Sequence, residues 1–138
     1  MSMKLIKKSE GVFGYVSYWL EGTKGLGLES GLKAVAKIAR ALEKEGCKLS
    51  ESIRCDGDYA NEKEFGDVGQ MWFKTVSDFE KAIPEIVEAN DYNVVMVFDN
   101  KGKWLRVSAG LGGELSVGVL GDADTAKAAA KVVAGSVG

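Results

Sequence analysis

Residues 12–46 read VFGYVSYWLEGTKGLGLESGLKAVAKIARALEKEG, and this stretch decides the expected fold. Residues 12–20 are rich in aromatic and β-branched side chains, which is typical of a β-strand. From Leu28 to Leu42 apolar residues recur every three or four positions, which predicts an apolar stripe along a helix. Gly46 is a natural end for that helix, because glycine adopts a left-handed conformation without strain. We therefore expect a strand, a glycine-rich connection and an amphipathic helix.

The following residues repeat this alternation of strands and helices. Residues 48–55 and 68–76 predict strands, since apolar and β-branched residues recur along them. Residues 77–80 form a capping box that predicts the start of a second helix. Pro84 is expected to kink that helix, because proline removes a helical hydrogen bond. Residues 92–98 are apolar on both faces and predict an interior strand.

Another strand pair and a short helix are expected after residue 98. Residues 99–102 predict a hairpin turn between residues 92–98 and a strand at 103–109, and residues 115–120 predict a further strand. Asp122 or Asp124 is expected to cap the last helix. The inward positions of that helix are small side chains, namely Ala126, Ala129, Ala130 and Val133.

Residues 12–98 thus spell βαββαβ, and the predicted fold class is α+β. We expect a two-layer antiparallel sheet with helices, whose ferredoxin-like core is extended by a β-hairpin and a C-terminal helix. Residues 1–138 suit a single domain. The two main helices should cover one face of the sheet. We expect the last helix or a second subunit to cover the other, since a large bare apolar face is unusual on a monomer.

The aromatic residues of the predicted central strands suggest two interpretations. One is an RNA-stacking sheet, but residues 69–73 lack the basic-glycine-aromatic run of that class. We favour core packing, because aromatic side chains contribute most to burial. The residues concerned are Phe13, Tyr15, Tyr18, Trp19, Trp72 and Phe73.

The charge balance and the cysteine content of the sequence argue against several classes of function. Lys and Arg total 18 against 20 Asp and Glu, for a net charge of -2, which argues against a dedicated nucleic-acid binder. Residues 1–4 lack the apolar core of a secretory signal, and no apolar run is long enough for a bilayer, so we expect a cytoplasmic protein without a membrane partner. Cys47 and Cys55 are predicted to be reduced thiols, because their spacing fits neither a zinc site nor a redox pair.

Two candidate ligand sites lie at the first helix. The glycine-rich segment with Lys24, Gly25, Gly27 and Gly31 could hold a phosphate or carboxylate on backbone amides, or it could be only a flexible connection. The helix also carries a basic stripe that could track phosphates or simply face solvent. That stripe consists of Lys33, Lys37, Arg40 and Lys44.

No catalytic residue, metal site or cofactor is predicted. The chain has no histidine, which excludes a Ser/His or Cys/His nucleophile within it. The acidic segment lacks the ligand order of a calcium loop, so a solvated loop is expected. Its residues are Asp56, Asp58, Glu62, Glu64 and Asp67.

The expected function is a small non-enzymatic interaction or ligand-binding module that self-associates, with a homo-oligomer or an unknown protein as partner. Leu111, in the glycine-rich turn at 110–113, is a candidate contact point. One alternative is a small enzyme or carrier that binds an anionic small molecule at the Lys24–Gly31 turn. A further alternative is a nucleic-acid binder that uses the basic face of the first helix, although the acidic balance counts against it.

Overall fold

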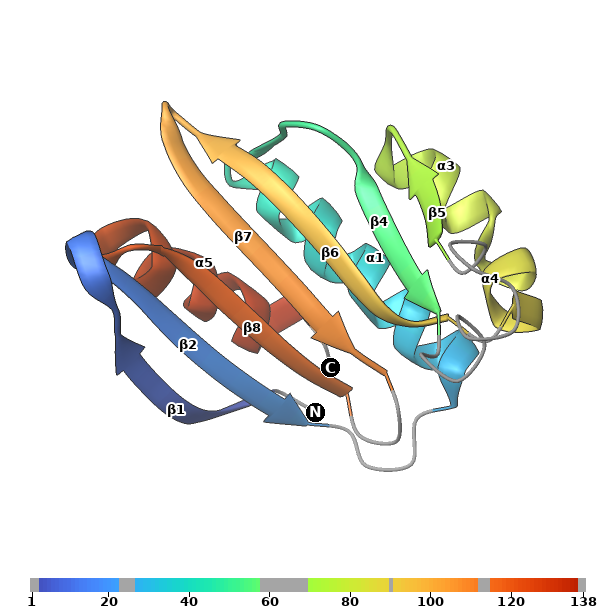
Figure 1. Cartoon of the computed structure of the whole chain (residues 1–138), viewed down its shortest axis with the longest axis horizontal. Helices are drawn as coiled ribbons and strands as arrows, with labels where there is room; N and C mark the ends of the chain where they lie inside the picture. Colours follow the sequence, from blue (N-terminus) through green and yellow to red (C-terminus); the bar gives the residue numbers. More distant parts are fainter. Residues whose placement is uncertain (1–2, 23–26, 58–69, 90, 112–114, 137–138) are drawn as a thin grey trace.

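A computed structural model describes residues 3–22, 27–57, 70–89, 91–111 and 115–136 (Figure 1). The strands are β1 (Lys4–Glu10), β2 (Tyr15–Gly22), β3 (Lys48–Leu49), β4 (Ile53–Gly57), β5 (Gln70–Phe73), β6 (Asp91–Asn100), β7 (Lys103–Gly110) and β8 (Leu115–Asp122). The helices are η1 (Val12–Gly14, a 3-10 turn), α1 (Leu28–Lys44), α3 (Val76–Lys81), α4 (Ile83–Ala89) and α5 (Ala123–Ser136). The predicted α+β class is therefore confirmed.

The strands described form one sheet in the order β1-β2-β8-β7-β6-β4-β5, with the short β3 paired to β6. All these pairs are antiparallel. The predicted ferredoxin-like arrangement of residues 12–98 is not confirmed, because the strand order differs and the sheet has more strands. In particular, β7 and β8 lie between β2 and β6 instead of extending an outer edge.

Local connectivity and strand length explain this order. β6, β7 and β8 follow one another as an antiparallel meander, and such neighbours in sequence pair readily. β8 then pairs with β2 along all eight residues of each strand. The shorter β4 and β5 pair with each other at the opposite edge of the sheet, where β4 also pairs with β6.

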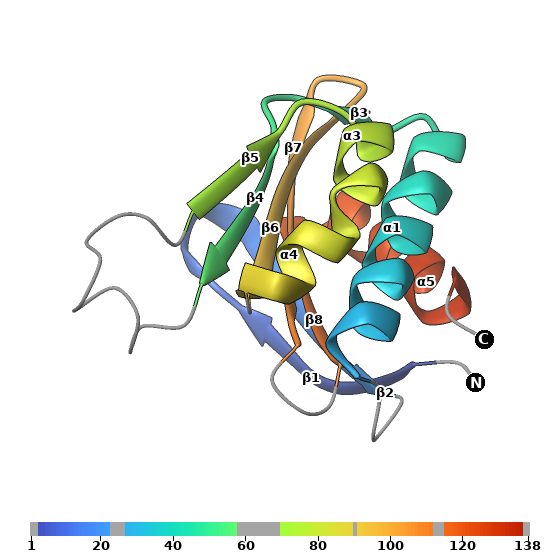
Figure 2. The same cartoon turned by 90° about the vertical axis from the view of Figure 1, so that its right-hand side faces the viewer.

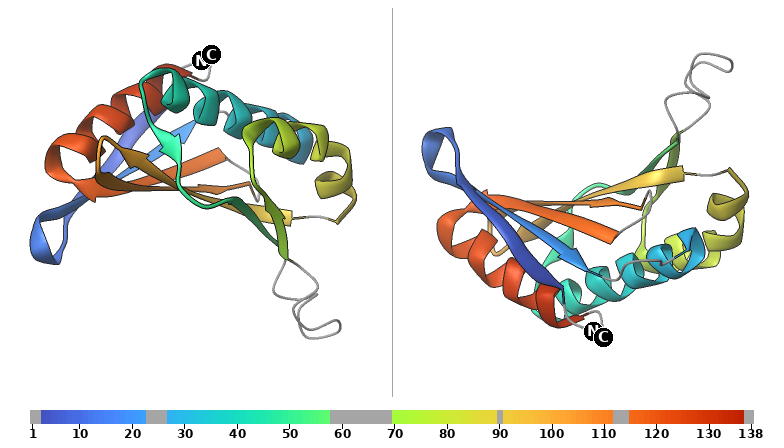
Figure 3. Two further views of the ribbon diagram at one scale, coloured as in Figure 1. Left: turned by 90° about the horizontal axis from the view of Figure 1, so that it is seen from above. Right: turned by 90° about the horizontal axis from the view of Figure 1, so that it is seen from below.

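All four α-helices of the described chain lie on one face of the sheet (Figures 2 and 3). The expectation that the last helix covers the second face is wrong. β8 ends at Asp122 and α5 begins at Ala123, so no loop carries the chain around the sheet. Asp122 also caps α5, accepting hydrogen bonds from the backbone amide and hydroxyl of Thr125 at 3.1 and 2.7 Å. The predicted inward positions are buried, as expected, at Ala126, Ala129, Ala130 and Val133.

The buried residues of α1 match the apolar stripe that the sequence predicts. Leu32, Val35 and Leu42 are inaccessible to solvent against the sheet and the neighbouring helices. Gly31 is also buried, and a Cβ atom there would lie 2.8 Å from Leu111 Cδ2. Leu111 is therefore a buried packing partner of α1, and its predicted role as an exposed contact point is wrong.

The second predicted helix is divided at the expected place. α3 ends at Lys81 and α4 begins at Ile83, one residue before Pro84. The cap differs from the prediction, because Thr75 rather than Ser77 accepts a hydrogen bond from the Asp78 amide, at 3.0 Å. The break lets the two short helices follow the edge of the sheet beside α1 (Figure 2).

Candidate functional site

The face of the sheet that points away from α1 and α5 is the candidate site, and we call it the open face. Successive side chains of a strand point to opposite faces. On β2, Val16, Tyr18 and Leu20 are buried beneath the helices, so the alternate residues Tyr15 and Trp19 lie on the open face. The pairing register extends this row across seven strands, through Lys7, Trp19, Gly118, Ser108, Val95, Arg54 and Trp72.

Four large aromatic side chains are exposed on the open face, and we call them the open-face aromatics. They are Tyr15, Trp19, Trp72 and Trp104, which are 39%, 40%, 57% and 41% exposed. They include all three tryptophans of the sequence. The predicted core packing is wrong for this set, although it holds for Tyr18 and in part for Phe73, which packs edge-on against Phe79.

Trp19 is held flat against the sheet by its neighbours. Its Nε1 donates a hydrogen bond to Glu21 Oε1 at 3.0 Å. Its ring lies over Gly118, where a Cβ atom would come within 3.3 Å of Cε3. A larger residue at this position would lift the indole from the sheet, so the glycine keeps the ring low and its outer surface available.

The other open-face aromatics are also fixed by specific contacts. Tyr15 and Trp104 meet edge to face, with ring centroids 5.7 Å apart. The Arg54 guanidinium lies over the Trp72 ring at 5.7 Å from its centroid, and Arg54 Nε is 2.9 Å from Asp56 Oδ1. The rings are therefore partly ordered before any partner arrives, which lowers the entropy cost of binding.

A shallow hollow of about 190 Å³ lies at the centre of the open face. Ser17, Ser108 and Gly118 provide small surfaces there, between Trp19 and Arg106. Arg106 is exposed and forms no ion pair with any residue that the structure describes. The centre of the face is thus low, with a bulky ring and an available guanidinium beside it.

The η1 end of the β1–β2 hairpin projects on the same side as the open face (Figure 3). Phe13 lies in this turn and is 94% exposed. Its φ is 61°, in the left-handed region that bulky residues rarely occupy. An exposed phenylalanine on strained backbone contributes nothing to the core, and strained residues often mark functional surfaces.

The predicted anion site at the start of α1 is only partly within the described residues. Lys24 and Gly25 lie outside them. Gly27 is the N-cap of α1 and makes no side-chain capping bond, while Gly31 packs against Leu111. The glycine at position 31 is therefore explained by close packing, and the anion site stays a prediction.

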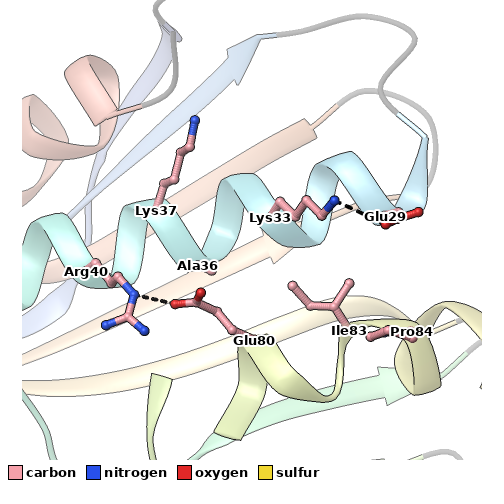
Figure 4. Close-up of a pocket in the computed structure, with 8 residues that line it drawn as sticks. All are labelled: Glu29, Lys33, Ala36, Lys37, Arg40, Glu80, Ile83 and Pro84. Carbon is pink, nitrogen blue, oxygen red and sulfur yellow. Dashed lines mark hydrogen bonds and ion pairs between the residues drawn. The ribbon is translucent and has the colours of Figure 1, made fainter. Parts of the chain in front are cut away.

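The predicted basic stripe lies along a groove of about 510 Å³ between α1 and α3–α4 (Figure 4). Two of its charges are neutralised, because Lys33 pairs with Glu29 at 3.2 Å and Arg40 pairs with Glu80. Lys37 points away from Glu80 in Figure 4. Lys44, in the last turn of α1, is exposed but does not line the groove. The structure thus does not bring the stripe together as one positive surface.

The remaining candidate groups show no reactive arrangement in the part of the chain that the structure describes. No cluster of three His, Cys, Asp or Glu side chains there could hold a metal ion. Most of the acidic segment, from Asp58 to Asp67, lies outside the described residues. Cys47 and Cys55 are buried, and burial together with the charge of Glu45 raises the pKa of the Cys47 thiol. A raised pKa disfavours the nucleophilic thiolate.

Sequence reasoning expected a second face of the sheet that needs a cover, but it assigned the aromatic residues to core packing, although a signal against that assignment was present. Along β2 the outward positions are Tyr15, Ser17, Trp19 and Glu21, which mix aromatic and polar side chains. The inward positions are uniformly large, at Val16, Tyr18 and Leu20. That difference between alternate positions is typical of a strand with one covered and one accessible face.

No protein-family model matches the chain, and no curated protein or solved structure matches it. Among the described residues, no helix is long and apolar enough to cross a membrane. Function must therefore be inferred from the geometry of the open face.

Proposed function

We propose that the protein is a non-enzymatic binding module whose contact surface is the open face. The observation that carries this proposal is the position of the open-face aromatics. Every tryptophan of the chain is exposed on one side of one sheet, where it adds little to the core. Tryptophan, tyrosine and arginine are the residues that most often dominate binding energy at interfaces. Arg54 and Arg106 accompany the rings on this face.

The chemistry of the chain supports binding rather than catalysis. The sequence has no histidine, and the hollow beside Trp19 is lined by hydroxyl, guanidinium and apolar groups.

Fluorine NMR of protein labelled with 5-fluorotryptophan tests this proposal, because each tryptophan gives one resonance on the open face. We expect the resonances of Trp19 and Trp104 to shift or broaden either as protein concentration rises or in an extract of the cells that make the protein. A fourth label introduced by Ser30→Trp, on the exposed side of α1, controls for viscosity. Open-face resonances that broaden no more than this control under both conditions would contradict the proposal.

A further inference from the structure

We propose that the occupant of the open face is the open face of a second copy of this chain, related by a twofold axis. This inference rests on the proposed function and names its partner. The resulting dimer has four layers, with two sheets packed face to face inside and the helices of each copy outside. A twofold contact uses the same patch on both copies, so that patch must be complementary to itself.

The size of the open face fits a stable dimer. Seven strands of four to ten residues, at about 3.4 Å per residue and a spacing of about 4.8 Å, give a footprint of roughly 800 Å². A standard specific interface buries about 800 Å² on each partner. One open face therefore provides the area that a second copy requires.

The large and small side chains of the open face can fit against those of a second copy. Ser17 and Ser108 form a low centre, which the ring of Trp19 and the side chain of Arg106 border. Packed sheets lie about 10 Å apart, so large side chains of one sheet must fit over small ones of the other. The hollow of about 190 Å³ is smaller than the roughly 300–1,000 Å³ typical of small-molecule pockets. It suits an inserted side chain better than a free ligand.

The charges of the face favour a protein partner of this kind over a nucleic acid. The register places Lys4 opposite Glu21 and Lys48 opposite Asp99 on this face, Arg54 is already paired with Asp56, and Lys7 and Arg106 also lie on it. Nucleic-acid surfaces carry an excess of Lys and Arg that neutralises phosphates. On this face three of the five cations already lie beside an anion, and the presence of both signs allows each copy to offer its cations to the anions of the other.

The turn at the end of the β1–β2 hairpin adds an arm to this interface. η1 extends beyond the sheet on the open side (Figure 3), and it carries the exposed Phe13. In a face-to-face dimer this turn reaches toward the outer strands of the other copy. Burial of the ring there accounts for an aromatic residue on strained backbone that its own chain does not cover.

Sedimentation equilibrium of the full chain tests the inference, from about 1 to about 200 μM, since interfaces of this size dissociate at micromolar concentrations or below. The decisive variant is Ser108→Glu, which places a carboxylate in the centre of the face. Its matched control is Ser30→Glu, the same substitution on the exposed side of α1. We expect dimers for the wild type and the control. Ser108→Glu should weaken association by about 100-fold or more, because the longer side chain fills the hollow and burial of its charge, even beside Arg106, carries a desolvation penalty.

Each outcome decides one point. Equal dissociation constants for all three proteins would place the association elsewhere, for example along the exposed edge of β1, and would overturn the inference. A wild-type monomer throughout the range would overturn it as well. In that case tryptophan resonances that still respond to the cell extract would leave the proposed binding function standing with a different partner. Far-ultraviolet circular dichroism of Ser108→Glu confirms that the variant is folded.

Discussion

On β7, Leu105 points toward the helices and is inaccessible to solvent, whereas the adjacent Trp104 points to the open face and is 41% exposed. The same contrast runs along β2, β6 and β8. Apolar side chains on the covered face are buried by the chain's own helices and provide most of its stability. Those on the open face are covered by no helix of the described chain, and we propose that a partner covers them. The two faces therefore show that an apolar residue in a strand signals either folding or binding, depending on what its own chain places above it.

The largest expected difference between the faces concerns one pair of leucines on neighbouring strands. Leu105→Ala on the covered face should lower the free energy of unfolding by about 2–5 kcal/mol, because it leaves a cavity. Leu120 is half-buried on the open face, and Leu120→Ala should lower the free energy of unfolding by only about 1 kcal/mol. Urea denaturation in the Ser108→Glu background measures both without the linkage of unfolding to dimer dissociation. Equal losses would contradict the assignment of the faces.

Gly31 tests how closely the covered side is packed. Gly31→Ala brings a Cβ atom within 2.8 Å of Leu111 Cδ2, and relief of that overlap should cost about 1–3 kcal/mol, partly offset by the better helix propensity of alanine. The matched control is Gly135→Ala in α5, where no atom lies within 4 Å of the new methyl group. Urea denaturation should show a loss for the first variant only. A stabilised Gly31→Ala protein would mean that α1 does not approach Leu111 closely.

The cap of α5 should give the covered side a measurable pH dependence. Hydrogen bonds from Thr125 lower the pKa of Asp122 below its ordinary value of 3.8. The cap therefore contributes its full stability above about pH 4, and that contribution is lost as pH falls through the lower pKa of the folded state. Asp122→Ala should cost about 1 kcal/mol near neutral pH, and the cost should shrink toward about pH 3. Asp122→Asn keeps the acceptor and serves as control. A cost for the alanine variant that does not change with pH would contradict the account.

Phe13 should contribute to association without contributing to the fold. Phe13→Gly removes a bulky residue from left-handed backbone, so the free energy of unfolding should change by less than about 1 kcal/mol, because relief of strain and the added freedom of glycine oppose each other. The matched control is Lys101→Gly, whose φ of 54° is similar in the β6–β7 turn. Sedimentation equilibrium should show weaker association for Phe13→Gly alone. Equal effects of the two variants would remove the hairpin arm from the interface.

Local patterns predicted the elements better than their arrangement. The inward stripe of α1, the small inward residues of α5 and the break near Pro84 are confirmed, since each depends on neighbours within a few turns of helix. The strand order was wrong because β8 joins β2 across nearly the whole chain, and no local pattern encodes such a pairing. The position of α5 followed from the same error.

The candidate site was the least predictable part. Trp19 and Trp72 look like core residues in any short window, because large aromatic side chains are usually buried. Only the comparison of alternate positions on a strand separates Trp19 from Tyr18. Only the fold shows that the helices of the described chain lie on one face of the sheet and leave the other face uncovered (Figure 3). Gly31 was misinterpreted for a different reason. Its conformational freedom suggested a loop or an anion site, whereas in the structure it allows α1 to pack closely against Leu111.

Acrylamide quenching of tryptophan fluorescence tests the central claim most directly, because the chain's only three tryptophans are all on the open face. If a second copy covers that face, the quenching constant should fall and the emission should shift to shorter wavelength as concentration rises through the range in which dimers form. Ser108→Glu should remain fully quenchable at every concentration. A wild-type dimer whose tryptophans are quenched as readily as those of the monomer would contradict the account.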